Sequence, residues 1–147
     1  MIYLESYKLF ENNSKIELGK FLLSEVEYFF NSLNDDFTIN FKRFNKDTTG
    51  EEAKWDSIFA SIRTENKEIS DYTVLEIEET INRCLNMLNL TITYISIGFN
   101  ENIEYNGNFY KRMATKYFNI KDNNIGDFLK FISSTEDIIH INLHFHF

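Results

Sequence analysis

Apolar positions spaced three and four residues apart predict four amphipathic helices, because residues at that spacing share one face of an α-helix. The predicted helices cover residues 15–34, a short segment with Trp55, Ile58, Phe59 and Ile62 on its apolar side, residues 72–89 and residues 125–133. Ser14-Lys15-Ile16-Glu17 has the form of a capping box, which predicts that the first helix begins there. Thr49-Gly50-Glu51-Glu52 has the same form ahead of the second helix.

Alternating apolar and polar residues predict the strands of a sheet. The predicted strands are residues 2–10, where the alternation is imperfect, the segment of Phe37, Ile39 and Phe41, residues 90–99 and residues 138–147. The alternation in 90–99 changes phase at Tyr94-Ile95, which predicts either a bulge or burial on both faces. Residues 111–120 fit a strand or a helix equally well.

Turn residues separate these segments. Asn34-Asp35-Asp36 ends the first helix, and Asp47-Thr48-Thr49-Gly50 is a turn. Asn106-Gly107 is the favoured pair for a tight hairpin, with apolar residues before and after it. The order of elements predicts a single α+β domain over residues 1–147, with about four helices packed on a mostly antiparallel sheet.

Length and composition agree with one globular domain. The chain has 147 residues, of which 43% are hydrophobic, and it contains no proline. A chain of this size buries enough apolar surface to fold without metal ions or disulfides. No Gly-, Ser- or Pro-rich stretch suggests a linker, and Cys84, the only cysteine, has no partner for an internal disulfide.

The charge indicates which partners to expect. The net charge is −8 at pH 7, and acidic residues are spread along the chain rather than gathered in a tail. Such a surface repels nucleic acids and anionic membranes on average, so we expect neither as a partner. Acidity of this size can serve solubility alone, or it can steer the protein toward a basic partner.

The start of the chain lacks the features of a secretory signal. Met1 to Glu5 include neither a basic segment nor a continuous apolar one, and no later apolar run is long enough to span a bilayer. We therefore expect a cytoplasmic protein.

The last strand carries the three histidines of the chain. His140, His144 and His146 alternate with apolar residues and so project from one side of the strand. His144 and His146 lie two residues apart, about 7 Å along a strand, which is close enough to share a metal ion. No recognisable motif supplies the remaining ligands, so the three histidines are weak metal candidates and the polar side of a strand explains them equally simply. No metal or other cofactor is predicted.

No motif of an enzyme is present. Nucleophilic catalysis needs a base beside the nucleophile and donors for the oxyanion, but Cys84 falls on the apolar side of the helix predicted over 72–89. A buried structural thiol is the better interpretation. Lys111-Arg112, among four aromatic residues between 109 and 118, is better explained as core and solvated rim than as a nucleic-acid platform. We predict no catalytic residues.

Aromatic residues beside acids are candidates for a protein interface, since interfaces favour aromatic anchors and a basic partner favours carboxylates. Several of these acids project from the helix predicted over 72–89. The candidate partner-binding residues are Asp71, Tyr72, Glu76, Glu78, Glu79, Glu104 and Tyr105.

In its general character the chain resembles the immunity proteins of bacterial toxin systems, including contact-dependent growth inhibition. The resemblance rests on size, on the lack of catalytic motifs and on the charge pattern of residues such as Asp35, Asp36, Glu76, Glu78 and Glu79. It implies stoichiometric occlusion of the active site of a toxin domain, commonly a basic nuclease. Two alternatives stay open: a phage-encoded inhibitor of a host defence protein, and a small-ligand or metal-binding module that uses the histidine strand. Nothing in the sequence sets the oligomeric state.

Overall fold

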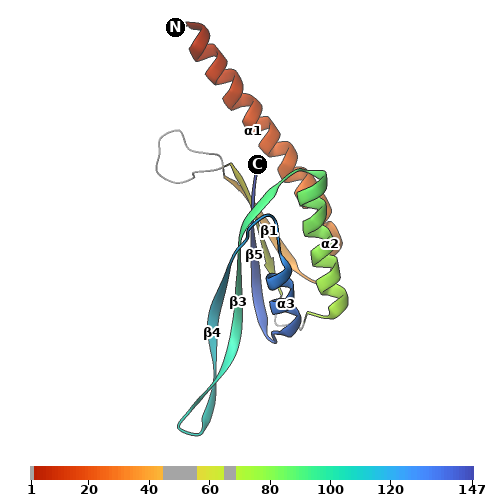
Figure 1. Ribbon diagram of the computed structural model, residues 1–147, viewed down its shortest axis with the longest axis vertical. Helices are drawn as coiled ribbons and strands as arrows, with labels where there is room; N and C mark the ends of the chain where they lie inside the picture. The colour runs from red at the N-terminus through yellow and green to blue at the C-terminus, as the bar shows by residue number, and fades with distance from the viewer. Residues whose placement is uncertain (1, 45–55, 65–68) are drawn as a thin grey trace.

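The computed structural model of the protein describes residues 2–44, 56–64 and 69–147, with side chains from Lys15 onward. Three helices and five strands follow one another along the described chain (Figure 1). They are α1 (Ile2–Phe30, followed by a 3-10 turn at Asn31–Leu33), β1 (Thr38–Phe44), β2 (Ser57–Arg63), α2 (Asp71–Met87), β3 (Thr91–Tyr105), β4 (Asn108–Asn119), α3 (Gly126–Ser134) and β5 (Ile138–His146).

The five strands form one antiparallel sheet in the order β1-β2-β5-β3-β4. The C-terminal strand β5 therefore lies in the centre of the sheet, between β2 and β3. Its buried residues Ile141, Leu143 and Phe145 alternate with more exposed ones, so one face of the sheet points into the core and the other points away.

The helices cover the core face of this sheet. Phe30 of α1 contacts Phe145 of β5 with 6.4 Å between ring centroids, and Phe128 of α3 contacts Phe118 of β4 at 6.2 Å. The buried side of α2 joins the same core through apolar residues at helical spacing, Val74, Ile77, Ile81, Cys84 and Leu85. Since all three helices pack on the same face of the sheet, the molecule is a two-layer α+β fold, and the predicted α+β class with a mostly antiparallel sheet is confirmed.

Several predicted elements are confirmed within a few residues. These are the helices over 72–89 and 125–133, the strands around Phe37 to Phe41, over 90–99 and over 138–147, and the Asn106-Gly107 hairpin. Both residues of that turn have positive φ, 51° and 78°, as a two-residue hairpin with right-twisted strands requires. In β3 the pairing with β5 shifts between Ile92 and Tyr94, and Ile95 to Gly98 are buried in succession, so a bulge and burial on both faces occur together.

The predicted second helix was wrong, which reduces four helices to three. Residues 57–63 form β2, where Ile58, Ala60 and Ile62 point into the core. Apolar residues at 58, 59 and 62 satisfy helical spacing, but a short apolar run fits either period. Trp55, the turn at 47–50 and the capping box at 49–52 lie outside the described residues.

The prediction for the N-terminal segment was also wrong. Residues 2–10 belong to α1 rather than to a strand, and Ser14 to Glu17 lie inside that helix instead of starting it. Residues 2–14 contain neither proline nor glycine, so nothing stops a helix anchored by Leu22, Val26 and Phe30 from continuing toward the N-terminus.

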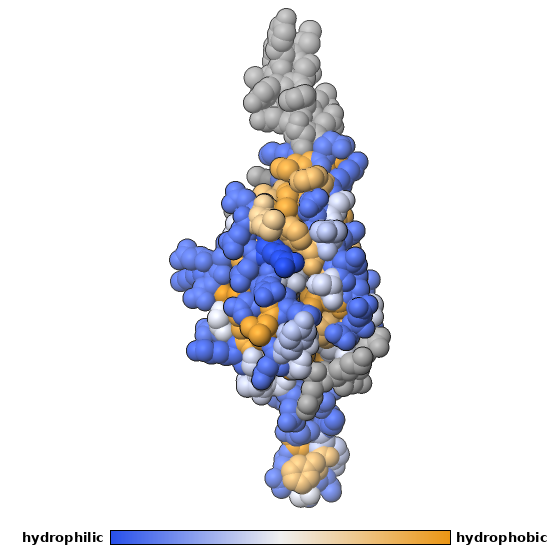
Figure 2. All heavy atoms as spheres, turned by 90° about the vertical axis from the view of Figure 1, so that its right-hand side faces the viewer, coloured by the Kyte–Doolittle hydropathy of each residue, from blue (hydrophilic) through white to orange (hydrophobic). Residues whose placement is uncertain are grey.

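The hairpin of β3 and β4 projects from one end of the molecule (Figure 1). Pairing between β3 and β5 ends at Phe99 and Ile138, whereas β3 and β4 stay paired as far as Tyr105 and Asn108. Figure 2 shows hydrophobic side chains at the tip of this arm. Among the described residues, no helix combines the length and the apolar character needed to span a membrane.

Candidate functional site

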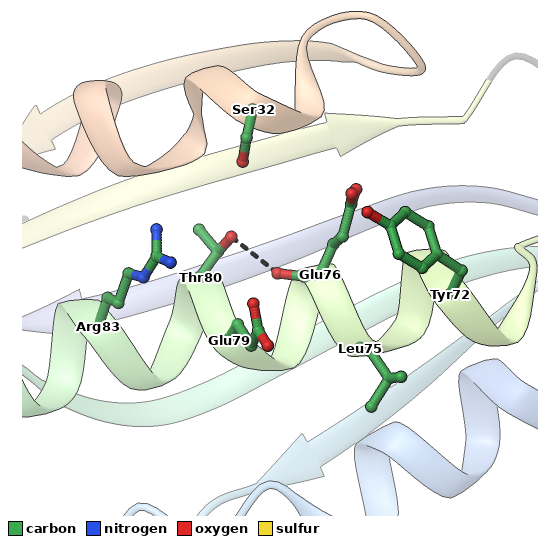
Figure 3. Close-up of a pocket in the computed structure, with 7 residues that line it drawn as sticks. All are labelled: Ser32, Tyr72, Leu75, Glu76, Glu79, Thr80 and Arg83. Carbon is green, nitrogen blue, oxygen red and sulfur yellow. Dashed lines mark hydrogen bonds between the residues drawn. The ribbon is translucent and has the colours of Figure 1, made fainter.

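A hollow of about 290 Å³ lies between the outward side of α2 and the end of α1 (Figure 3). Because the opposite side of α2 is buried, residues one turn apart on the outer side line up along the hollow. The lining residues are Ser32 from the 3-10 turn and Tyr72, Leu75, Glu76, Glu79, Thr80 and Arg83 from α2. The hollow therefore presents an aromatic ring, two carboxylates and one guanidinium to the solvent.

Polar contacts fix part of this surface. Ser70 caps the helix, since its side chain accepts a hydrogen bond from the Thr73 amide at 3.2 Å. The side chain of Glu76, through its hydrogen-bonding capacity and its negative charge, raises the pKa of Tyr72. The Thr80 hydroxyl donates to the Glu76 carbonyl at 2.7 Å, so it is satisfied within the helix.

The carboxylates of this helix are not neutralised by neighbouring cations. Four acids lie on α2, Asp71, Glu76, Glu78 and Glu79, against the single base Arg83. The ion pairs in the described part of the chain join Lys20 to Glu17, Lys111 to Asp137 and Arg112 to Glu101, and none involves α2. The outer side of α2 is therefore a net negative surface with an exposed tyrosine and leucine.

The structure divides the seven candidate partner-binding residues into two groups. Tyr72, Glu76 and Glu79 meet at the hollow, while Asp71 and Glu78, two helical turns apart on α2, do not line it. Glu104 and Tyr105 lie at the tip of the hairpin arm, away from α2 (Figure 1). Sequence reasoning did not find Leu75 and Ser32, because Leu75 is an apolar residue outside the core and Ser32 comes from another element.

The second candidate surface is the sheet face that points away from the helices. His140, Asn142, His144 and His146 all project from it, as the alternation of β5 predicted. The His144 ring packs against Phe59 at 4.7 Å and Tyr94 at 5.1 Å, and Tyr94 in turn stacks on Tyr117 at 5.7 Å. A row of ring contacts thus crosses four strands of the sheet.

Hydrogen bonds order the residues on both sides of this row. Ser61 donates to the Asn142 side-chain oxygen at 2.8 Å, and the Asn142 amide donates to Ser96 at 3.2 Å. On the other side of the row, Thr93 Oγ1 lies 2.6 Å from His146 Nε2. Burial lowers the pKa of all three histidines, and Arg63 adds to this effect for His140 and His146 for His144.

These contacts do not favour a metal site. In the described residues, no group of three or more His, Cys, Asp or Glu side chains is placed to hold a metal ion. His144 is enclosed by two aromatic rings, and a ring nitrogen of His146 already contacts Thr93. The histidines fit better as packed members of the sheet face than as ligands.

The remaining chemical candidates are structural. Cys84 is fully buried on the core side of α2, as predicted, and burial raises its pKa to about 12, so the unreactive thiol form persists. Lys111 and Arg112 are solvent-exposed, as a rim predicts, but among the four aromatic residues between 109 and 118 only Phe118 joins the core, where it packs on α3. Phe109 and Tyr110 are exposed because the hairpin extends beyond β5, and Tyr117 is exposed because it lies on the sheet face that points away from the helices.

Comparison of the chain with protein-family models, with curated protein sequences and with solved structures gave no match, so none of them indicates an activity.

Proposed function

We propose that this protein is a protein-binding inhibitor of the toxin-immunity type, which uses the outer side of α2 to occlude the active site of a basic partner. One observation carries the proposal. Tyr72 and Leu75 are 71% and 56% exposed beside Glu76 and Glu79, and neither carboxylate has an ion pair within the described chain.

This combination suits a protein surface rich in cations. A lysine or arginine side chain that entered the hollow would meet the carboxylates of Glu76 and Glu79 and the ring of Tyr72. The exposed apolar area of Tyr72 and Leu75 would be removed from water at the same time. Charge complementarity raises the association rate, and packed aromatic anchors lengthen the lifetime of a complex.

A toxin nuclease is a suitable partner because its substrate groove must be cationic to bind a polyanion. An acidic face that covers such a groove excludes substrate by occupying its place, so the inhibitor needs no catalytic group of its own. A phage-encoded inhibitor of a host defence protein would act through the same face, and only the identity of the partner separates the two readings.

The test is capture followed by titration. Tagged protein is used to isolate its partner from lysate of the source cells, and the nuclease activity of that partner is then measured against increasing amounts of the inhibitor. The proposal expects complete loss of activity at a one-to-one ratio. A captured partner that remains fully active in the saturated complex would contradict occlusion.

A further inference from the structure

Strand β4 presents a long unpaired edge. It is 12 residues long, it stands last in the order of the sheet, and among the strands that the structure describes β3 alone pairs with it. Because Tyr105 and Asn108 close a two-residue hairpin, the odd-numbered residues of β4 direct their N–H and C=O groups away from β3. No other backbone hydrogen bond in the described chain reaches residues 108–119.

The opposite edge of the sheet is different. β1 is only 7 residues long, and Arg43 donates a hydrogen bond to the Ile16 carbonyl of α1 at 3.0 Å, so α1 packs against this strand. A short edge strand is one way in which natural sheets limit pairing with another strand, since an open edge is a template for it.

Exposed apolar side chains accompany the open edge of β4. Phe109, Met113 and Tyr117 are 77%, 64% and 60% exposed and lie four residues apart on the sheet face that points away from the helices. Tyr110 is exposed on the other side. A strand that combines free backbone groups with four large exposed side chains has both requirements for pairing.

We propose that β4 pairs in antiparallel orientation with β4 of a second copy of this chain, with Met113 opposite its own equivalent. The two five-stranded sheets would then form one continuous sheet across a two-fold axis. This inference does not depend on the proposed function.

The sequence of β4 fits this register. Phe109 then faces Tyr117 of the other copy, Tyr110 faces Lys116, Lys111 faces Thr115 and Arg112 faces Ala114, so every cation lies opposite an uncharged side chain. Aromatic cross-strand pairs at both ends of the interface are stabilising.

Neighbouring registers are less favourable. The outward-pointing N–H and C=O groups of the two strands face each other only if the register moves by an even number of residues. A shift of two residues places Arg112 opposite Arg112 in one direction and opposite Lys116 in the other. Like charges directly opposite each other destabilise a strand pair. A shift of four residues either opposes Lys111 to Lys111 or leaves Phe109 and Tyr110 beyond the paired region.

The cations of β4 do not prevent this pairing. Charged residues on an edge strand usually oppose association, but here Lys111 forms an ion pair with Asp137 at 2.9 Å and Arg112 forms one with Glu101. The ammonium of Lys116 lies over the Phe118 ring, 5.8 Å from its centroid. The local charge of the edge is therefore largely compensated within each copy.

The first test is the mass of the full chain in solution. Analytical ultracentrifugation at micromolar protein concentrations should show a mass twice that of the 17.5 kDa monomer. Met113→Lys places two like charges at the two-fold axis and should weaken dimerisation about tenfold or more without changing the circular dichroism spectrum. Tyr28→Lys adds the same charge at a similarly exposed position on α1 and should leave the dimer intact. A monomer at all concentrations, or a dimer unaffected by Met113→Lys, overturns the proposal.

A disulfide trap tests the register. In a hydrogen-bonded pair the Cα atoms lie about 5.5 Å apart, which a disulfide can bridge, so Met113→Cys should cross-link the two copies on mild oxidation. Thr115→Cys is on the same sheet face, but in this register its equivalent is four residues along the strand, about 13 Å away. Cross-linking of Thr115→Cys as fast as Met113→Cys would contradict the proposed pairing.

Discussion

The imidazole of His140 lies directly over Gly98, its register partner in the adjacent strand. A Cβ atom built at Gly98 would lie 2.2 Å from His140 Cε1 and 2.7 Å from both ring nitrogens, which is closer than atoms can approach. Glycine is therefore required at this position of β3 by the side chain across from it and not by a left-handed backbone. The pair sits at one end of the sheet face that carries the row of rings around His144.

Gly98→Ala should destabilise the protein by about 1–3 kcal/mol, because the added methyl group displaces the His140 ring or the backbone of a central strand. In a His140→Ala background, Gly98→Ala should leave the free energy of unfolding almost unchanged or increase it, since alanine lowers the entropy of the unfolded chain. Urea denaturation of the four proteins of this double-mutant cycle measures the coupling. Equal costs of Gly98→Ala in both backgrounds would show that the contact with His140 is not the cause.

Acid should destabilise the fold through its histidines. Burial lowers the pKa of His140, His144 and His146 in the folded state, so the unfolded chain binds protons more readily. The stability that the fold keeps while these histidines are neutral is fully present above the ordinary histidine pKa of about 6.5 and is lost as the pH falls below it. Thermal melts between about pH 7 and pH 5 should show a falling midpoint, with a shallower fall in His144→Gln. An identical pH slope in that variant would exclude His144 as a contributor.

Cys84 should be inert in the native protein. The thiol is fully buried, and a pKa of about 12 leaves almost no thiolate at neutral pH. Reaction with a thiol reagent should therefore proceed only as fast as the chain opens, and it should become immediate in denaturant. Fast labelling under native conditions, with the circular dichroism spectrum unchanged, would contradict the burial of this residue.

Association with a basic partner should depend on the acids of α2. Changing Glu76, Glu78 and Glu79 together to glutamine should slow association about tenfold or more at low salt and flatten its salt dependence. The dissociation rate should change less, because packing rather than long-range attraction sets it. Association kinetics measured over a salt series are the readout, and rates equal to those of the unmodified protein would place the contact elsewhere.

The elements that the sequence predicted well are those with one unambiguous period. Strand β5 alternates without exception from His140 to His146, and α2 keeps its apolar positions at three- and four-residue spacing for its whole length. Residues 57–63 were mistaken for a helix because Phe59 is apolar yet lies on the face opposite the core, where it contacts His144. An apolar residue on both faces of a short strand removes the alternation on which the prediction depends.

The candidate surfaces were only partly predictable, because spacing along one element does not reveal its neighbours in space. The three histidines were placed on one side of a strand, but their contacts with Phe59 and Tyr94 require the order and register of the sheet. Tyr72, Glu76 and Glu79 were selected as separate acids and aromatics, and helical geometry brings them to one hollow. Glu104 and Tyr105 show the same pairing of acid and aromatic, yet the hairpin carries them to another part of the molecule.

Parallel capture experiments test the central claim, that α2 binds a basic protein, most directly. Tagged wild-type protein, a Glu76→Gln/Glu79→Gln variant and a Glu25→Gln/Glu27→Gln variant, which removes two carboxylates of α1 outside the hollow, are applied to the same lysate at low and high salt. The account predicts one stoichiometric basic partner that the wild type and the α1 variant retain at low salt, that high salt releases and that the α2 variant fails to hold. A partner retained equally by all three proteins, or no stoichiometric partner in any of them, would contradict it.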